Sequence, residues 1–408
     1  MLSPLEVESI RSIYESDVVR ILQELIRARS DFPPGDTRAA IGVVERELEN
    51  AGISSQCFAM DPVRQSLLAE IGVMDADPVL LFHAHIDTVP PGDFSRWTYS
   101  PFEGSLSGDC VYGRGAGDAK GSVAAQLAAF LALARSGMIR KGRIMLAIVA
   151  DEESGGEFGT RWLHDDGKLA ADVVVIGEQT NNKISIAERI ACGIDLTVYG
   201  KSAHGAMPWE GENAVLKTCR AIAYLFEHLT PRLEARKHPY LPAPTLNVGR
   251  IQGGIQWSIV PEVCMVEMDR RLIPGETREA AMQEIEAILD QFNEHVEPLN
   301  YSIFSEGDVA LNVDTDPKDP FIQVANRALS DLVGEERSLI GYVQTSDGRW
   351  FAKDGIPILH FGPGDPVLAH AADEYVPVQQ LVEAAQFLTL LGLRWQNLVL
   401  ETEGPHQN

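Results

Sequence analysis

Histidine and acidic side chains gather at five places along the sequence, each just past an apolar run or in the loop after it. The five segments read LLFHAHIDTVP, YGRGAGDAKGS, IVADEESGGEFG, VVVIGEQT and FGPGDPVLAHAADE. Imidazole nitrogens and carboxylate oxygens bind divalent cations, and a pair of such ions can activate water and polarise a carbonyl group. Together the segments predict a two-metal site that uses no thiolate ligand.

The first segment places two histidines and an aspartate at alternate positions. Residues two apart in an extended chain share a face, so His83, His85 and Asp87 are expected to point the same way. Imidazole suits zinc, and a nearby carboxylate can hold the ring in one tautomer. A buried strand with polar residues at its mouth would give the same pattern.

The other segments offer carboxylates and a further histidine. The glycines around Asp118 lack GxGxxG spacing, so they indicate close passage of the backbone rather than a phosphate loop. Asp118 also opens a predicted helix, which leaves an N-cap role open. In the run 151–153 (DEE), one carboxylate can bind metal while its neighbour moves protons, although a solvated turn would look alike. Glu178 and His370 each follow an apolar run, and neither supports a prediction alone.

Apolar periodicity predicts two styles of fold in one chain. Helices at 17–30, 37–51 and 118–136 alternate with apolar runs at 79–82, 143–150 and 173–176. Such runs are typical of a mostly parallel sheet covered on both faces, and ligands gather at its carboxyl edge. The next segment has the order β-α-β-β-α-β, which is that of a ferredoxin-like unit. Its expected elements lie at 194–200, 212–229, 245–250, 263–272, 277–294 and 301–304. A strand at 356–361 and a helix at 378–391 return to the first style.

These patterns predict an α/β catalytic domain interrupted by a ferredoxin-like α+β lid or dimerisation domain. The expected boundaries divide the chain into 1–184, 185–304 and 305–408, with the middle part inserted. The chain has 34 basic and 59 acidic residues, and this net charge of −25 disfavours nucleic acid and anionic membranes as partners. The five cysteines are scattered without a CxxC pair, and no signal peptide or long apolar span is apparent, so we expect a cytoplasmic protein.

The five segments, in this order, resemble the motifs of the M20 peptidase family. That family includes acetylornithine deacetylase, succinyl-diaminopimelate desuccinylase, aminoacylase and glutamate carboxypeptidase. The resemblance implies hydrolysis of an amide bond in a small N-acyl amino acid or related carboxylate. It also implies two divalent cations, zinc in most members, with cobalt or manganese as substitutes. A metallo-carboxypeptidase or dipeptidase of the same fold, and a non-catalytic metal- or peptide-binding relative, remain as alternatives.

The resemblance also implies roles for individual side chains. Those that match metal ligands of the family are His85, Asp118, Glu153, Glu178 and His370. Asp118 would bridge the two cations. Glu152 matches the general base, and Asp87 matches the carboxylate that orients His85. His83 matches no functional residue of the family and is expected to be structural.

Further matches lie in and after the inserted segment. His204 in YGKSAHGAMPWEGENAV matches a histidine that reaches the active site of a partner subunit and stabilises the oxyanion, which implies a homodimer. Arg271 in MDRRLIPGE matches an arginine that holds the substrate carboxylate. Thr345 and Arg349 in QTSDGRW lie where relatives line the pocket. A surface ion pair, which contributes little, is the alternative for each arginine. Ser258 replaces an asparagine of desuccinylase-like relatives, so the acyl group stays open.

Two other patterns of metal-dependent hydrolase fit less well. The amidohydrolase barrel also begins with HxH, but it needs several more histidines at strand ends, and the sequence has only ten in all. A ferredoxin-like insertion is also foreign to a barrel. The metallo-β-lactamase pattern HxHxDH fails because Thr88 follows Asp87.

Overall fold

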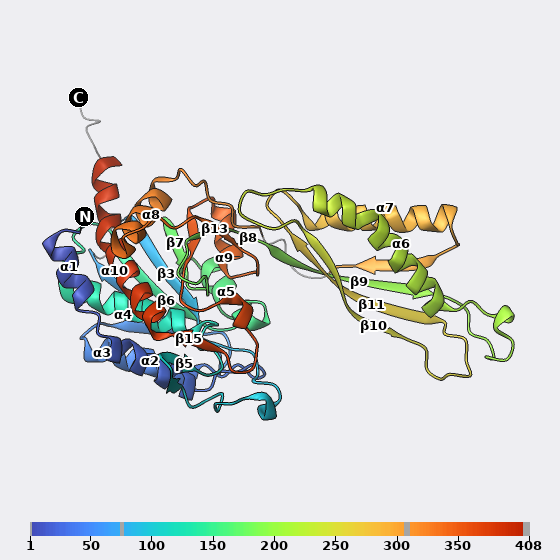
Figure 1. Ribbon diagram of the computed structural model, residues 1–408, viewed down its shortest axis with the longest axis horizontal. Helices are drawn as coiled ribbons and strands as arrows, with labels where there is room; N and C mark the ends of the chain where they lie inside the picture. The colour runs from blue at the N-terminus through green and yellow to red at the C-terminus, as the bar shows by residue number, and fades with distance from the viewer. Residues whose placement is uncertain (1, 74–76, 306–310, 403–408) are drawn as a thin grey trace. The chain divides into compact units, whose positions relative to one another are not determined.

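The computed structural model describes residues 2–73, 77–305 and 311–402, which fall into two compact units (Figure 1). Unit 1 consists of Met1–Ile186, Val313–Tyr342 and Ser346–Asn408, and unit 2 of Ala187–Asn312 and Val343–Thr345. A large mixed sheet lies in the first unit and a separate antiparallel sheet in the second, which confirms the predicted fold class. The boundaries predicted after residues 184 and 304 stay a proposal for where separately folding domains begin and end.

The large sheet has eight strands in the order β1-β2-β6-β3-β7-β14-β8-β13. Their bounds are β1 (Ser55–Ala59), β2 (Gln65–Gly72), β3 (Val79–His85), β6 (Arg143–Val149), β7 (Val173–Ile176), β8 (Ser185–Glu188), β13 (Ile340–Tyr342) and β14 (Ile358–His360). The central strands β6, β3, β7 and β14 run parallel. On the flanks, the pairs β1–β2, β2–β6 and β14–β8 are antiparallel, so the sheet is mixed. All residues of β3 and β7 are buried, as continuous runs of this kind require.

Helices cover both faces of this sheet (Figure 1). They are α1 (Pro4–Arg11), α2 (Glu15–Arg27), α3 (Arg38–Asn50), α4 (Lys120–Ser136), α5 (Thr160–Asp165), α8 (Pro320–Val333), α9 (Gly348–Phe351) and α10 (Val378–Thr402). On one face α4 packs against β3, α2 and α10, and it is buried as far as Leu133. On the other face, Leu163 of α5 and Phe351 of α9 join a core with Leu81 of β3. Among the described helices, none combines the length and apolarity that a bilayer crossing needs.

A small three-stranded sheet joins two distant parts of unit 1. Its order is β15-β5-β4, and its strands are β4 (Ser105–Ser107), β5 (Cys110–Tyr112) and β15 (Tyr375–Pro377). Both pairs are antiparallel. The chain that leaves β5 therefore runs beside the chain that enters β15, and the N–H of Gly113 donates to the Glu374 carbonyl at 2.9 Å. Two of the five predicted site segments meet in this way.

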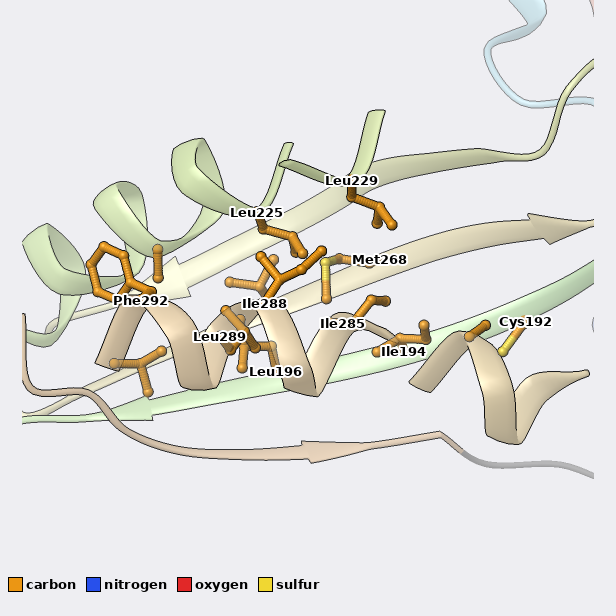
Figure 2. Packing of buried hydrophobic residues seen from close by; sticks show 14 of the residues in the cluster. Cys192, Ile194, Leu196, Leu225, Leu229, Met268, Ile285, Ile288, Leu289 and Phe292 are labelled. Atoms are coloured by element: carbon orange, nitrogen blue, oxygen red, sulfur yellow. The ribbon is translucent and has the colours of Figure 1, made fainter. Parts of the chain in front are cut away.

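Unit 2 has the predicted β-α-β-β-α-β order. Its elements are β9 (Ile190–Tyr199), α6 (Ala214–Ala235), β10 (Thr245–Gly253), β11 (Val263–Leu272), α7 (Arg278–His295) and β12 (Asn300–Phe304). The antiparallel sheet has the order β10-β11-β9-β12. Buried and exposed residues alternate along β9 and β11, so only one face is apolar. That face packs under both helices, where Leu196, Leu225, Met268 and Ile288 form the core (Figure 2).

Candidate metal centre

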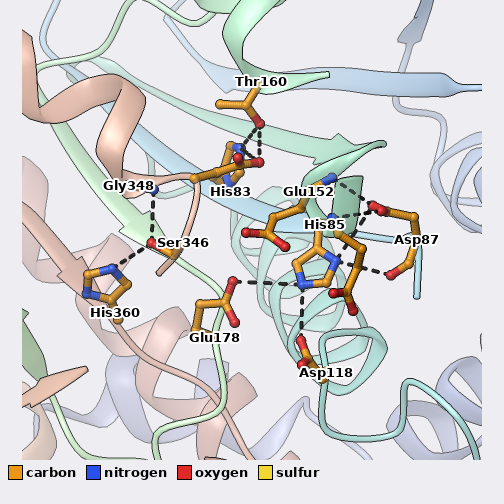
Figure 3. Close-up of polar contacts among 12 residues, drawn as sticks. His83, His85, Asp87, Asp118, Glu152, Thr160, Glu178, Ser346, Gly348 and His360 are labelled. Carbon is orange, nitrogen blue, oxygen red and sulfur yellow. Dashed lines mark hydrogen bonds and ion pairs between the residues drawn. The ribbon is translucent and has the colours of Figure 1, made fainter. Parts of the chain in front are cut away.

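Four of the predicted segments leave the large sheet at the same edge because they follow parallel strands. His85 ends β3, the run 151–153 follows β6, Glu178 follows β7, and the segment with His370 follows β14. Ligands of open α/β sheets gather at the carboxyl ends of such strands. Figure 3 shows the side chains of His85, Asp118 and Glu178 directed toward one another. The predicted site segments therefore converge in unit 1.

Asp118 lies between two groups of potential ligands. Its Oδ1 is 3.2 Å from Nε2 of His85, and its Oδ2 is 3.4 Å from Nε2 of His370. Ligand atoms of His85, Asp118 and Glu178 lie within 4.8 Å of one another, and so do those of Asp118, Glu153 and His370. The N-cap of α4 is Ala119, so the alternative role of Asp118 as a helix cap is wrong. Each Asp118 oxygen faces one of the two groups.

Glu178 and Glu153 complete these two groups. Oε1 of Glu178 is 3.8 Å from Nε2 of His85, and its Oε2 accepts the Tyr342 hydroxyl at 2.9 Å. Oε2 of Glu153 is 3.2 Å from Nε2 of His370, while its Oε1 is buried and has no hydrogen-bond partner among the described residues. A buried carboxylate oxygen without a partner is costly, and a cation would supply that partner. The nitrogen and oxygen donors therefore fit divalent cations such as zinc.

The ionisation of these groups is strongly coupled to their surroundings. Hydrogen bonds with Asp118 and Glu153 raise the pKa of His370 to about 10. Burial raises the pKa of Glu178 to about 8. Burial also acts to raise the pKa of Asp118, but hydrogen bonds from His370 and His85 outweigh it and lower that pKa. Carboxylates this close need protons or cations between them, so cation binding would release protons.

Asp87 holds the turn that follows β6. One of its carboxylate oxygens accepts the N–H of Glu152 at 3.2 Å (Figure 3). The other accepts the N–H of Glu153 at 3.1 Å. Nδ1 of His85 lies 3.6 Å from Oδ1 of Asp87 and 3.1 Å from its backbone oxygen. Asp87 thus lies beside the imidazole and also fixes the turn that carries both glutamates. Its role in orienting His85 stays a prediction.

Glu152 lies beside a guanidinium group in a buried setting. Its Oε1 is 3.8 Å from Nη1 of Arg349, and Nη2 of Arg349 donates to the Gly155 carbonyl at 3.0 Å. Burial raises the pKa of Glu152 well above its usual value. A carboxyl group with a raised pKa, close to a cluster of candidate metal ligands, has the chemistry of a group that accepts a proton and returns it.

A buried chain of polar groups connects β3 to the Arg349 segment, and sequence reasoning missed it. Nε2 of His83 is 2.8 Å from Oγ1 of Thr160 (Figure 3). The Thr160 hydroxyl donates to Oδ2 of Asp347 at 2.5 Å. Oδ1 of Asp347 lies 3.6 Å from Nη2 of Arg349. Burial lowers the pKa of His83 to about 3, so its ring is neutral. The HxH spacing placed His83 on the face of His85, but no local signal identified its partners.

The remaining predicted residues divide between the units. His204, Arg271 and Thr345 belong to unit 2, and Arg349 belongs to unit 1. Arg271 donates to Oδ2 of Asp269 at 2.9 Å and to Oγ1 of Thr345 at 3.3 Å, so two predicted substrate-binding residues are in contact. His204 is exposed, and its Nδ1 accepts the N–H of Ala206 at 3.1 Å.

Comparison with known proteins gives consistent matches over most of the chain. Residues 81–394 match the model of peptidase family M20/M25/M40. The succinyl-diaminopimelate desuccinylase of Methylocella silvestris is 30% identical over 89% of this chain and 94% of its own. A probable succinyl-diaminopimelate desuccinylase of Staphylococcus epidermidis is 27% identical over 89% of this chain and 93% of its own.

Solved structures share the fold at lower identity. An M20 family metallo-carboxypeptidase of Sulfolobus solfataricus has a TM-score of 0.77 at 19% identity, covering 93% of this chain and 99% of its own. An aminopeptidase of Bacillus cereus has a TM-score of 0.75 at 21% identity, covering 94% of this chain and 99% of its own. The chain therefore belongs to peptidase family M20/M25/M40 and is a metallohydrolase that acts on amide bonds.

Proposed function

We propose that this protein uses two divalent cations to hydrolyse the amide bond of a small N-acyl amino acid or a related carboxylate. The proposed ligands are His85, Asp118, Glu153, Glu178 and His370. The observation that carries the proposal is Asp118, whose two oxygens lie 3.2 Å and 3.4 Å from a histidine of each group. Relatives named succinyl-diaminopimelate desuccinylase support the substrate class.

The proposed chemistry places a proton carrier beside the cations. When bound, such cations lower the pKa of water to about 7 and polarise a carbonyl oxygen. Glu152 takes one proton from the attacking water as the oxygen forms its bond to the carbonyl carbon. Glu152 then gives that proton to the amide nitrogen as the carbon–nitrogen bond breaks, which leaves a carboxylic acid and an amine. The acid then loses the second proton of the water, and the amine takes it up, so the final products are a carboxylate and an ammonium group. Arg349 lies 3.8 Å from Glu152 and favours its charged form.

We assign recognition of the substrate carboxylate to Arg271, supported by its contact with Thr345. We expect Arg349, which lies beside Glu152 in unit 1, to line the substrate pocket there. We propose that His204 stabilises the oxyanion in a partner subunit, which requires a homodimer assembled through unit 2. Zinc is the proposed native cation because it favours imidazole and carboxylate ligands, and cobalt or manganese would substitute for it.

A hydrolysis panel with a paired variant tests this proposal. The zinc-loaded protein would be offered N-succinyl and N-acetyl amino acids and unmodified dipeptides. We expect hydrolysis of at least one N-acyl amino acid, and a loss of about 10²- to 10⁴-fold in kcat for Glu152→Gln because the proton carrier is gone. Zinc content should stay that of the parent, since Glu152 is not among the proposed ligands.

Glu157→Gln is the matched control, because Glu157 lies in the same loop with its side chain 65% exposed. Its turnover should equal that of the parent. Undiminished turnover by Glu152→Gln would refute the role of Glu152 as general base. Cleavage of dipeptides, with every N-acyl amino acid left intact, would refute the substrate class and favour a peptidase.

A further inference from the structure

Glu374 is a buried carboxylate that binds the loop before α4 through several donors at once. Its side chain is 1% exposed. Oε1 accepts the N–H groups of Gly117 at 2.8 Å and Asp118 at 3.0 Å. Oε2 accepts the N–H of Gly115 at 3.2 Å and Nη1 of Arg114 at 2.5 Å. One carboxylate therefore fixes the backbone of the residue proposed to bridge the two cations.

Arg114 connects Glu374 to a second proposed ligand, His370. Its side chain is 2% exposed, and its Nη2 donates to the backbone carbonyl of His370 at 3.2 Å. His370 has φ of 63°, a left-handed conformation that is uncommon outside glycine. An arginine presents several donors in a rigid fork, so Arg114 can bind Glu374 and the His370 carbonyl together. The ion pair joins the Asp118 loop to the His370 loop.

Two glycines of the GRGAGDAKG segment, Gly115 and Gly117, lie in the backbone that Glu374 binds. Gly115 has φ of 81°, a conformation that side chains disfavour. A Cβ added at Gly117 would lie 3.6 Å from Oε1 of Glu374, which is ordinary van der Waals contact, so the carboxylate lies next to the backbone there. The loop thus presents the N–H groups of Gly115, Gly117 and Asp118 to Glu374.

We propose that Arg114 and Glu374 are a positioning pair that sets the separation between Asp118 and His370. The inference rests on the proposed two-cation site and goes beyond it, because neither side chain is a proposed ligand. Burying an ion pair costs desolvation free energy, and such a pair contributes little net stability. Its contacts instead converge on two of the three residues around one cation, those of the group Asp118, Glu153 and His370. Groups that orient ligands typically alter metal affinity by about 10- to 100-fold.

The variant Glu374→Gln tests the pair while keeping the side-chain shape. A glutamine amide has one acceptor oxygen. Its NH₂ group would face two of the donors whose hydrogen bonds the carboxylate accepts in the parent. Metal-free protein would be titrated with Zn²⁺ against a chromophoric chelator, which gives two dissociation constants. We expect one zinc ion to bind about 10- to 100-fold more weakly. The affected step should be the one that His370→Ala removes.

Glu383→Gln is the matched control, because Glu383 lies in the same unit and binds Arg337 and Asn182, neither of which is a proposed ligand. It should bind both zinc ions as the parent does. Two unchanged dissociation constants in Glu374→Gln, with two ions bound by the parent, would overturn the positioning role alone. A parent that binds fewer than two zinc ions would overturn the proposed function and this inference with it.

Melting temperatures of the metal-free proteins check that each variant is folded. If Glu374→Gln does not fold, Arg114→Lys addresses the same pair, because a single ammonium lacks the fork that reaches both Glu374 and the His370 carbonyl. The same selective loss of one zinc ion is expected. An unchanged titration of Arg114→Lys would overturn the pair's role.

Discussion

Thr160 offers a sharp test of the buried polar chain in unit 1. Its hydroxyl lies between Nε2 of His83 at 2.8 Å and Oδ2 of Asp347 at 2.5 Å. Thr160→Val keeps the shape but leaves both atoms without this partner. Among the described residues, Nδ1 of His83 and Oδ1 of Asp347 already have no hydrogen-bond partner. The substitution would therefore strip two buried side chains of the hydrogen bond that joins them.

The expected cost follows from these contacts. Each of the two unsatisfied polar groups costs about 2 kcal/mol, and the added buried methyl group regains about 1 kcal/mol. The free energy of unfolding should therefore fall by about 3 kcal/mol. Thr389→Val is the control, because Thr389 is equally buried and its hydroxyl donates to the Ala385 carbonyl within α10. That carbonyl keeps its helical hydrogen bond, so we expect a loss below about 1 kcal/mol.

Urea denaturation followed by tryptophan fluorescence measures both free energies of unfolding, since Trp162 and Trp350 lie close in sequence to Thr160 and Asp347. Turnover gives a second readout. Asp347 lies 3.6 Å from Arg349, which lies 3.8 Å from Glu152, so Thr160→Val should also lower kcat more than Thr389→Val does. Equal unfolding free energies for the two variants would refute the reasoning.

Two further predictions concern other parts of the molecule. Arg271→Ala should raise KM by about 10- to 100-fold with little change in kcat, because a charged hydrogen bond to the substrate is lost. Steady-state kinetics measure both constants, with Arg250→Ala as the control. An unchanged KM in Arg271→Ala would contradict the assignment. Glu47 accepts two hydrogen bonds from Arg20, which hold the pKa of Glu47 below its ordinary 4.5. A lowered pKa stabilises the fold above about pH 4.5, and this stability is lost as the pH falls through the folded-state pKa. Glu47→Gln should therefore lower the free energy of unfolding by less than about 1 kcal/mol at pH 7 and leave it unchanged in strong acid. Urea denaturation at both pH values measures this. A difference in unfolding free energy that persists in acid would show that it does not come from the ionised Glu47 carboxylate.

Local sequence was sufficient where a proposed ligand is placed by its own strand. His85, the run 151–153 and Glu178 each follow a continuous apolar run, and parallel strands bring their carboxyl ends to one edge. The β-α-β-β-α-β order of unit 2 was equally readable, because buried and exposed residues alternate along β9 and β11.

Contacts between residues far apart in the chain could not be predicted from the sequence. Glu374 is 260 residues from Arg114, and Asp347 is 187 residues from Thr160, so no spacing rule connects either pair. The strands β4, β5 and β15 have three residues each, which is too short for a periodic pattern. The helix-cap role considered for Asp118 was wrong because tertiary contacts, rather than local sequence, decide where that side chain points. A polar residue before a helix resembles an N-cap in sequence, whether or not tertiary contacts direct its side chain elsewhere.

The most direct measurement is anomalous diffraction at the zinc absorption edge from crystals of the zinc-loaded protein. Two peaks about 3.5–4 Å apart are expected on either side of Asp118. One should lie against His85 and Glu178, and the other against Glu153 and His370. A single peak, or peaks that make no contact with the Asp118 carboxylate, would contradict a two-cation centre built on that residue.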